Sequence, residues 1–148
     1  MPRIPEPFKP LQLSPNPFID DVGPLYGAMI DGRFVMGFQV EERHCNPAGN
    51  CHGGMLMTLA DMVLLIGANF GAGVNRFLVT VSLATDFLAP APVGSWLEGR
   101  VDVLRVTRRL IFVQGIVSIA GEPCLRINAT LKPVGDSSPG HAPARYLG

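Results

Sequence analysis

The stretch Asn46-Pro-Ala-Gly-Asn-Cys-His52-Gly53-Gly54-Met-Leu-Met-Thr-Leu-Ala-Asp61 decides the fold of this chain. It leads from a glycine-rich loop into an apolar segment that runs to about Val74. We predict a helix from about Gly53 to Phe70, because the glycines of Gly71-Ala-Gly73 favour a helix end. Asp61 lies inside the apolar segment, where an ionised carboxylate is costly unless it is paired or hydrogen-bonded. This position predicts a functional role for Asp61.

The composition sets limits on partners and location. The chain has 148 residues, enough for one domain with a substantial core. Apolar residues make up 47% and charged residues 16%, so we expect oligomerisation to cover part of the surface. The formal net charge of zero argues against binding to nucleic acid or to an anionic membrane. Three cysteines without a framework spacing, and an N-terminus without an apolar signal-peptide core, predict a cytoplasmic protein.

A membrane span is the main structural alternative for the apolar segment. Residues 55–74 are nearly long enough to cross a bilayer, and Gly67-x-x-x-Gly71 is a helix-packing spacing. Asp61 and Asn69 oppose that interpretation. A helix that is apolar all round is also typical of a helix enclosed by protein, so we expect no membrane insertion.

Strand patterns surround the predicted helix. Residues 25–30 and 34–40 are joined by Asp31-Gly32, a strong hairpin signal. After the helix we predict four strands in a meander: 78–88, 97–107 with a one-residue bulge, 110–119, and a last strand through 125–131. Strand 110–119 is apolar on both faces and therefore central. The pattern predicts an α+β fold, with an antiparallel sheet of about six strands and one long helix.

The remaining segments flank this domain, which we place at residues 25–134. Residues 1–24 carry seven prolines, which predict an extended arm with one helical turn near residues 18–22. Residues 135–148 are typical of a flexible tail. One helix covers only one face of a sheet and leaves the sheet edges open. Edge-to-edge pairing in a symmetric homodimer would address both problems.

The motif Asn46-x5-His52-Gly53-Gly54-x6-Asp61, with this element order, resembles the hotdog-fold acyl-CoA thioesterases. Within them it is similar to the PaaI-like branch related to 4-hydroxybenzoyl-CoA and phenylacetyl-CoA thioesterases. The resemblance covers about residues 25–134 and includes Phe87-Leu-Ala-Pro90 followed by Gly94. It implies hydrolysis of acyl-CoA to a carboxylic acid and CoA, with the sheet wrapped around the helix. It also implies a homodimer or homotetramer and no cofactor beyond the CoA of the substrate.

The resemblance assigns roles to the residues of the motif. The N–H of Gly53, at the positive end of a helix, would hold the developing oxyanion, with His52 supporting it and Gly54 contacting the substrate. Asp61 would act as general base or nucleophile. Because Asp61 lies two helical turns further along, it would reach the thioester only across a subunit interface. Asn46 would orient the nucleophilic water or Asp61.

Several of these residues also have purely structural interpretations. Asn46 precedes a proline and could begin a turn by bonding its own backbone. His52 could be a loop or cap residue, and Gly53-Gly54 alone marks many helix entries. Thr80 matches a position that orients water in the resembled family, or it is an ordinary strand threonine.

Three arginines near the turn before Leu110 have two interpretations: Arg105, Arg108 and Arg109. They either bind the phosphates of CoA, since arginine matches phosphate geometry, or they belong to a solvated hairpin.

Other chemistries fit the sequence less well. His44-Cys45-x5-Cys51-His52 lacks the usual zinc spacing, so we expect no metal site. No G-x-S-x-G nucleophile motif or phosphate-binding G-x-x-x-x-G-K-[ST] motif is present. The alternative to a thioesterase is a non-catalytic acyl-CoA-binding protein of the same fold.

Overall fold

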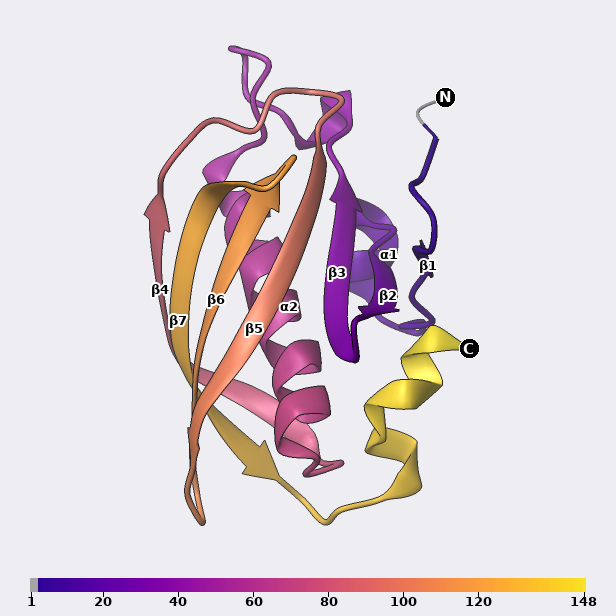
Figure 1. Cartoon of the computed structure of the whole chain (residues 1–148), viewed down its shortest axis with the longest axis vertical. Coiled ribbons are helices and arrows are strands. Elements are labelled where there is room, and N and C mark those ends of the chain that lie inside the picture. The colour runs from indigo at the N-terminus through magenta and orange to yellow at the C-terminus, as the bar shows by residue number, and fades with distance from the viewer. Residues whose placement is uncertain (1–2) are drawn as a thin grey trace.

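The computed structural model describes residues 3–148; residues 1 and 2 of the predicted arm lie outside that range. One antiparallel sheet curls around a single long helix (Figure 1), which confirms the predicted α+β architecture. Residues 3–148 form seven strands of this sheet, in the order β1-β2-β3-β5-β6-β7-β4. The elements are β1 (Lys9–Pro10), α1 (Pro17–Val22), β2 (Tyr26–Ile30), β3 (Arg33–Gln39), η1 (Glu42–His44), α2 (Gly53–Ala72), β4 (Phe77–Phe87), β5 (Trp96–Val106), β6 (Ile111–Ile119), β7 (Glu122–Val134), η2 (Pro139–His141) and η3 (Pro143–Leu147).

The predicted β2–β3 hairpin is confirmed. Asp31 and Gly32 form its two-residue turn with φ values of 51° and 75°. Both values are positive, as a turn that follows the right-handed twist of the strands requires. The α-helical turn predicted near residues 18–22 is also present, as α1.

The predicted meander of four strands is wrong for β4. Strands β5, β6 and β7 follow one another in the sheet, but β4 pairs with β7, from Phe77 opposite Val134 to Phe87 opposite Leu125. Residues 88–95 carry the chain from β4 to β5 across the end of the sheet (Figure 1), and β5 pairs with β3. Sequence neighbours often pair, but hydrophobic alternation does not say which strand lies beside which. The predicted bulge in β5 is confirmed, between Val103 and Arg105.

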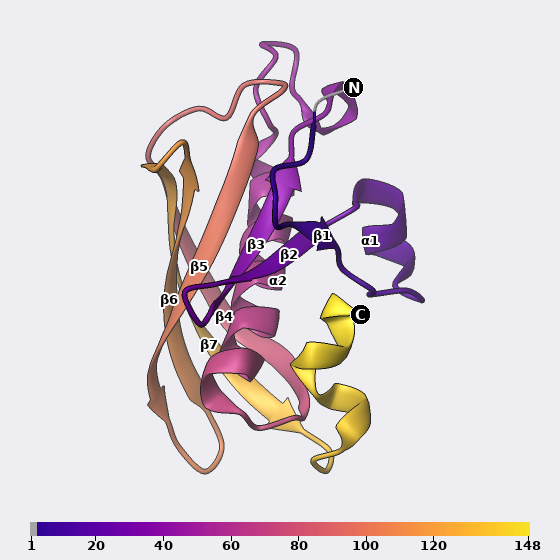
Figure 2. The same ribbon diagram turned by 45° about the vertical axis from the view of Figure 1, so that its right-hand side comes forward.

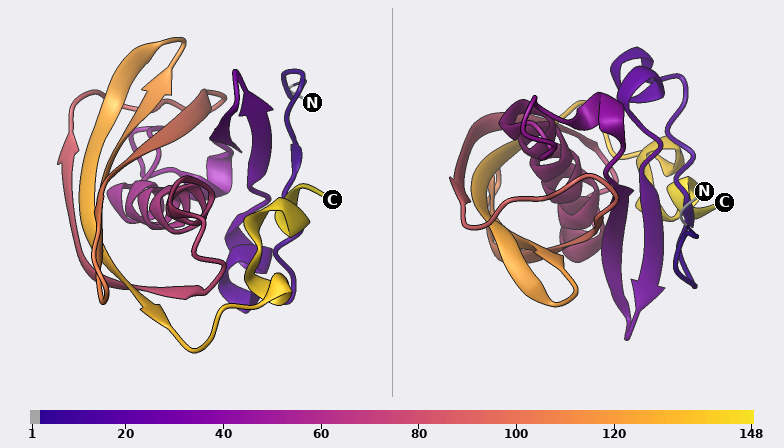
Figure 3. Two further views of the ribbon diagram at one scale, coloured as in Figure 1. Left: turned by 60° about the horizontal axis from the view of Figure 1, so that its bottom comes forward. Right: turned by 90° about the horizontal axis from the view of Figure 1, so that it is seen from above.

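Helix α2 lies in the concave side of the sheet (Figure 3). A Cβ atom on Gly67 would lie 2.9 Å from Val101 Cγ2, and one on Gly71 would lie 2.7 Å from Val103 Cγ2. The Gly67-x-x-x-Gly71 spacing therefore lets β5 approach the helix closely. By length and composition α2 could cross a membrane, but half of its most apolar window is buried inside this domain.

The C-terminal segment, predicted to be a flexible tail, is folded onto the domain. Turns η2 and η3 lie beside the C-terminal half of α2 (Figure 2), and Pro143 in η3 is buried. Tyr146 and Leu147 pack against the main core cluster, and Gln12 N–H donates to Tyr146 O at 2.9 Å. This contact is long-range, so the polar, proline-rich composition of the segment did not reveal it.

Candidate active site

The loop before α2 is closed by the side chain of Asn46. Its Oδ1 accepts hydrogen bonds from the N–H groups of Ala48 at 3.0 Å and Asn50 at 3.2 Å. These bonds form an Asx-type turn, which is the structural interpretation of this residue. The half-buried Asn46 also lines a pocket next to the helix start, so a contact with substrate is still available to it.

The first turn of α2 leaves one backbone donor free. His52 is the N-cap, and its Nδ1 accepts a hydrogen bond from Gly54 N–H at 3.1 Å. The N–H groups of Met55 and Leu56 both donate to His52 O. Within residues 3–148, the N–H of Gly53 donates to no acceptor. Because helix N-termini attract negative charge, Gly53 N–H is available to a ligand oxygen.

Nothing within residues 3–148 requires glycine at position 53. Its φ is not in the left-handed region, and a Cβ there would meet only Phe87, at 3.5 Å from Cζ, an ordinary van der Waals contact. A ligand that approaches the backbone closely at Gly53 would explain why this position is glycine.

A pocket of about 460 Å³ lies over this helix start. The pocket lies between the loop before α2 and the end of β4 with the segment that follows it. Its lining residues are Asn46, Asn50, Cys51, Gly53, Leu56, Phe87, Leu88, Ala89, Pro90 and Ala91. Phe87 is 56% exposed and Leu88 51% exposed. The sequence predicted no role for either residue, although two large apolar residues, separated from Pro90 only by Ala89, were an available signal.

Asp61 lies on the side of α2 that faces β4, and it is half-buried. Thr80 Oγ1 of β4 donates to Asp61 Oδ1 at 2.5 Å. The described residues supply no ion-pair partner for this carboxylate. The structure therefore joins Asp61 and Thr80, two of the predicted site residues, through a charge-assisted hydrogen bond.

Asp61 and Gly53 do not meet within one chain. Eight residues separate them along α2, which corresponds to about 12 Å along the helix axis. One carboxylate and one N–H donor at that separation cannot act on the same thioester carbon.

The arginine hairpin lies far from the helix start. Arg105, Arg108 and Arg109 are exposed at the tip between β5 and β6. Strand β5 runs beside α2 in the direction of the helix, so this tip lies near the helix C-terminus (Figure 1). The same chain therefore does not bring these arginines to Gly53.

The histidine and cysteines near the loop have structural environments. His44 is buried, with Nε2 2.7 Å from Val22 O and Nδ1 accepting from Glu41 N–H at 2.9 Å. Burial lowers the pKa of His44 from its ordinary value. No cluster of three potential metal ligands occurs within residues 3–148. That a metal is unnecessary stays a prediction.

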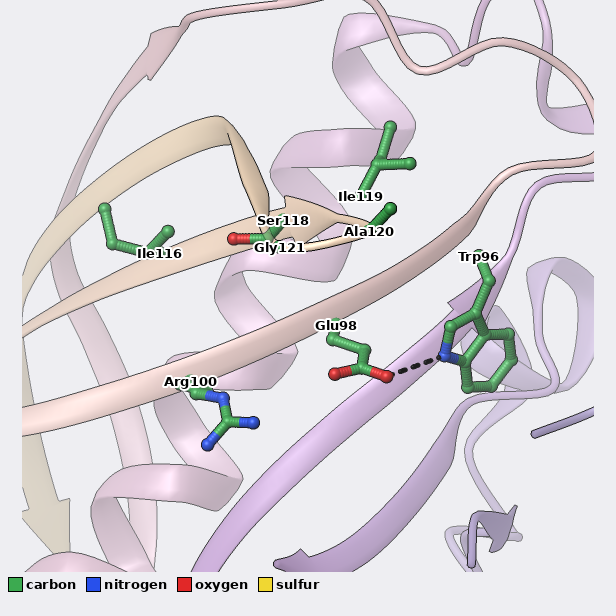
Figure 4. A pocket seen from close by; sticks show the side chains of 8 residues that line it. All are labelled: Trp96, Glu98, Arg100, Ile116, Ser118, Ile119, Ala120 and Gly121. Carbon is green, nitrogen blue, oxygen red and sulfur yellow. Dashed lines mark hydrogen bonds between the residues drawn. The ribbon is translucent and has the colours of Figure 1, made fainter. Parts of the chain in front are cut away.

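A second pocket, of about 490 Å³, lies on the outer face of β5 and β6 (Figure 4). Trp96 Nε1 donates to Glu98 Oε1 there at 3.2 Å, and Arg100 lines the same pocket. None of the site residues predicted from the sequence lines it, so we place the candidate active site at the start of α2.

Comparison with known proteins identifies the family of the chain. Residues 48–123, about half of the chain, match the family model of the thioesterase superfamily. A Pseudomonas aeruginosa protein named as a candidate esterase is 38% identical over 113 residues, covering 76% of this chain and 84% of the relative.

Two solved structures share the fold. The PaaI protein from the phenylacetic acid degradation operon of E. coli superposes with a TM-score of 0.73 at 19% identity, covering 83% of this chain and 88% of that one. A hypothetical thioesterase from Streptococcus pneumoniae TIGR4, solved with coenzyme A, gives a TM-score of 0.67 at 21% identity, covering 77% and 91%. The chain therefore belongs to the thioesterase superfamily, with a PaaI-like hotdog fold, and is a thioester hydrolase.

Proposed function

We propose that this enzyme hydrolyses acyl-CoA thioesters and that each active site is shared by two copies of the chain. The free N–H of Gly53, at the start of a 20-residue helix and inside a pocket, is the observation that carries the proposal. The S. pneumoniae structural neighbour, solved with coenzyme A, supports CoA as the thiol part of the substrate. Both a cytoplasmic location and the absence of a cofactor remain predictions.

The reaction assigns a separate task to each group. Gly53 N–H donates to the thioester carbonyl oxygen and holds its negative charge as the tetrahedral intermediate forms. Asp61 removes a proton from the attacking water, and Thr80 holds the carboxylate through the Oδ1 hydrogen bond. When the C–S bond breaks, the CoA sulfur takes up the proton that Asp61 removed from water, and the acyl group leaves as a carboxylic acid.

A second copy of the chain would supply the carboxylate. Strand β4 is an edge of the sheet and carries exposed apolar side chains: Phe77 at 59%, Val79 at 41% and Val81 at 58% exposure. An exposed apolar edge strand favours pairing with another strand. Antiparallel pairing of β4 with its copy about a two-fold axis would reverse one protomer relative to the other. It would bring Asp61 of a second copy towards the pocket at Gly53.

Mixed dimers test this arrangement directly. We expect Asp61→Asn and Gly53→Pro each to lose turnover across a panel of short, medium, long and aromatic acyl-CoAs, followed by release of free thiol. Equal mixing and refolding of the two inactive variants should then restore about a quarter of wild-type activity, because half of the dimers contain one intact shared site out of two. If both residues act within one chain, mixing restores nothing. Saturable binding of every acyl-CoA by the wild type, without thiol release, would instead identify a non-catalytic binding protein.

The exposed arginines allow a test of CoA recognition. In the reversed partner the β5–β6 tip would lie at the same end as Gly53 of the first copy. We expect Arg105→Ala, Arg108→Ala and Arg109→Ala in combination to raise KM for acyl-CoA several-fold. KM for the matching acyl-N-acetylcysteamine, which has the thioester but no phosphates, should not change. An unchanged KM for acyl-CoA would place these arginines in a solvated hairpin.

A further inference from the structure

Two of the three cysteines face each other across the loop that precedes α2. Cys45 and Cys51 are partners in an isolated antiparallel bridge. The hydrogen bonds on either side join neighbouring residues: Asn46 N–H to Asn50 O and His52 N–H to His44 O, both at 2.8 Å. The cysteines therefore occupy a non-hydrogen-bonded pair, where Cα atoms lie about 4.5 Å apart and both side chains point to the same side. That separation falls within the range of Cα distances found in disulfides.

The two thiols differ in accessibility. Cys51 is 5% exposed, and burial, with smaller contributions from Cys45 and Cys124, raises its pKa to about 12. Cys45 is half-buried, and its Sγ lies 3.4 Å from Glu41 O. An oxidant in solution therefore meets Cys45 first, while Cys51 lies behind it as a second thiol. Cys124, the third cysteine, is 1% exposed and has no place in the bridge.

We propose that Cys45 and Cys51 form a reversible disulfide when the protein meets a peroxide. The Cys45 sulfur attacks one peroxide oxygen, the O–O bond breaks, and a sulfenic acid and one water form. The Cys51 thiol then attacks the Cys45 sulfur, the S–O bond breaks, and a second water leaves as the S–S bond forms. The two sulfurs together lose two electrons, which reduce the peroxide, and a dithiol reverses the change.

The disulfide would act on the loop that holds the candidate site. It would close residues 46–50, including the Asn46 turn, and it lies directly before His52. Opening of this loop exposes the amides of Asn46 and His52, whose hydrogen bonds flank the bridge. A covalent link at the bridge restricts the open state, so the amides should exchange more slowly. Oxidation therefore stabilises the folded form of this loop.

Peptide mapping of the full chain tests the pairing. The protein is treated with hydrogen peroxide, unfolded in guanidinium chloride so that every remaining thiol is accessible, blocked with N-ethylmaleimide and digested with trypsin. Cleavage after Arg43 and Arg76 places both Cys45 and Cys51 in peptide 44–76, whereas Cys124 falls in peptide 110–126. We expect peptide 44–76 to lose the mass of two hydrogens and take up no label, and to regain two labels after dithiothreitol. Peptide 110–126 should be labelled throughout.

Matched variants separate this disulfide from general oxidation. Cys45→Ser should abolish the loss of two hydrogens, and Cys124→Ser should react as the wild type does. Hydrogen exchange at the amides of Asn46 and His52 should slow by roughly tenfold or more on oxidation, in the wild type and in Cys124→Ser only. Full labelling of peptide 44–76 after peroxide, a sulfinic acid at Cys45, or a link to Cys124 would each overturn the proposal.

Discussion

Replacement of Gly53 by proline removes one N–H and disturbs little else. Gly53 is the first residue of α2, a position where proline is favoured because its fixed φ suits the helix start. The preceding His52 has φ −61° and ψ 138°, the extended conformation that a residue before proline adopts. The N–H that is lost donates to no acceptor within residues 3–148, so we expect α2 to remain folded.

Gly53→Ala is the matched control, because it keeps the N–H and adds only a Cβ. That Cβ would lie 3.5 Å from Phe87 Cζ, an ordinary contact, so alanine measures the effect of added volume alone. Loss of a single oxyanion donor typically lowers kcat by about 10²–10³, or about 2.7–4 kcal/mol of transition-state stabilisation. We therefore expect Gly53→Pro to turn over at least about 100-fold more slowly than Gly53→Ala.

The assay is steady-state release of CoA thiol, followed with a thiol-reactive dye, together with the thermal unfolding midpoint of each variant. Both variants should unfold within a few degrees of the wild type. Equal turnover by the proline and alanine variants, with both folded, would refute Gly53 N–H as the oxyanion donor. A proline variant that is inactive and also unfolds early would contradict our placement of Gly53 as a proline-compatible first residue.

Three further perturbations test the site and the fold. Thr80→Val removes the donor to Asp61, so kcat should fall about tenfold, whereas Thr80→Ser should keep most of it; a fully active valine variant would exclude the positioning role. Gly99→Ala would place a Cβ 2.6 Å from Val63 Cγ2, so the free energy of unfolding should drop by about 1–3 kcal/mol and partly recover on adding Val63→Ala; an unchanged urea midpoint would contradict this close packing. Burial lowers the pKa of His44 below 6.5, so its contribution to stability is complete above pH 6.5 and declines below it, because the unfolded chain binds the proton more readily. As the pH falls below 6.5, the urea midpoint should decline more steeply in the wild type than in His44→Gln. An NMR titration in which His44 of the folded protein takes up its proton above pH 6.5 would contradict the lowered pKa.

Elements set by local backbone chemistry were predicted well. The Asp31-Gly32 turn needs two positive φ values, and this residue pair tolerates them. Gly73 ends α2 in the left-handed conformation with φ 64°, as glycine favours, although the helix continues two residues past the predicted Phe70, through Gly71 to Ala72. The bulge in β5 was visible because a one-residue insertion shifts the hydrophobic alternation.

Features that depend on distant partners were not determined by the sequence. The pairing of β4 with β7 and the packing of η3 on α2 both join segments far apart in the chain. Alternation within a strand shows which residues face the core, but not which neighbour the strand takes. The lining of the 460 Å³ pocket could not be predicted from the sequence for the same reason, because it combines residues from a loop, a helix start and a strand end.

Asp61 shows most clearly the difference between what the sequence predicts and what only the tertiary structure determines. The sequence alone marked it as a carboxylate within an apolar helix, and its spacing from Gly53 fixed the separation of the two along one chain. Only the tertiary structure decided its surroundings: it is half-buried, faces the edge strand β4 and accepts a hydrogen bond from Thr80. The partner lies 19 residues away on a strand whose position follows from the whole sheet, so no local pattern could specify this contact.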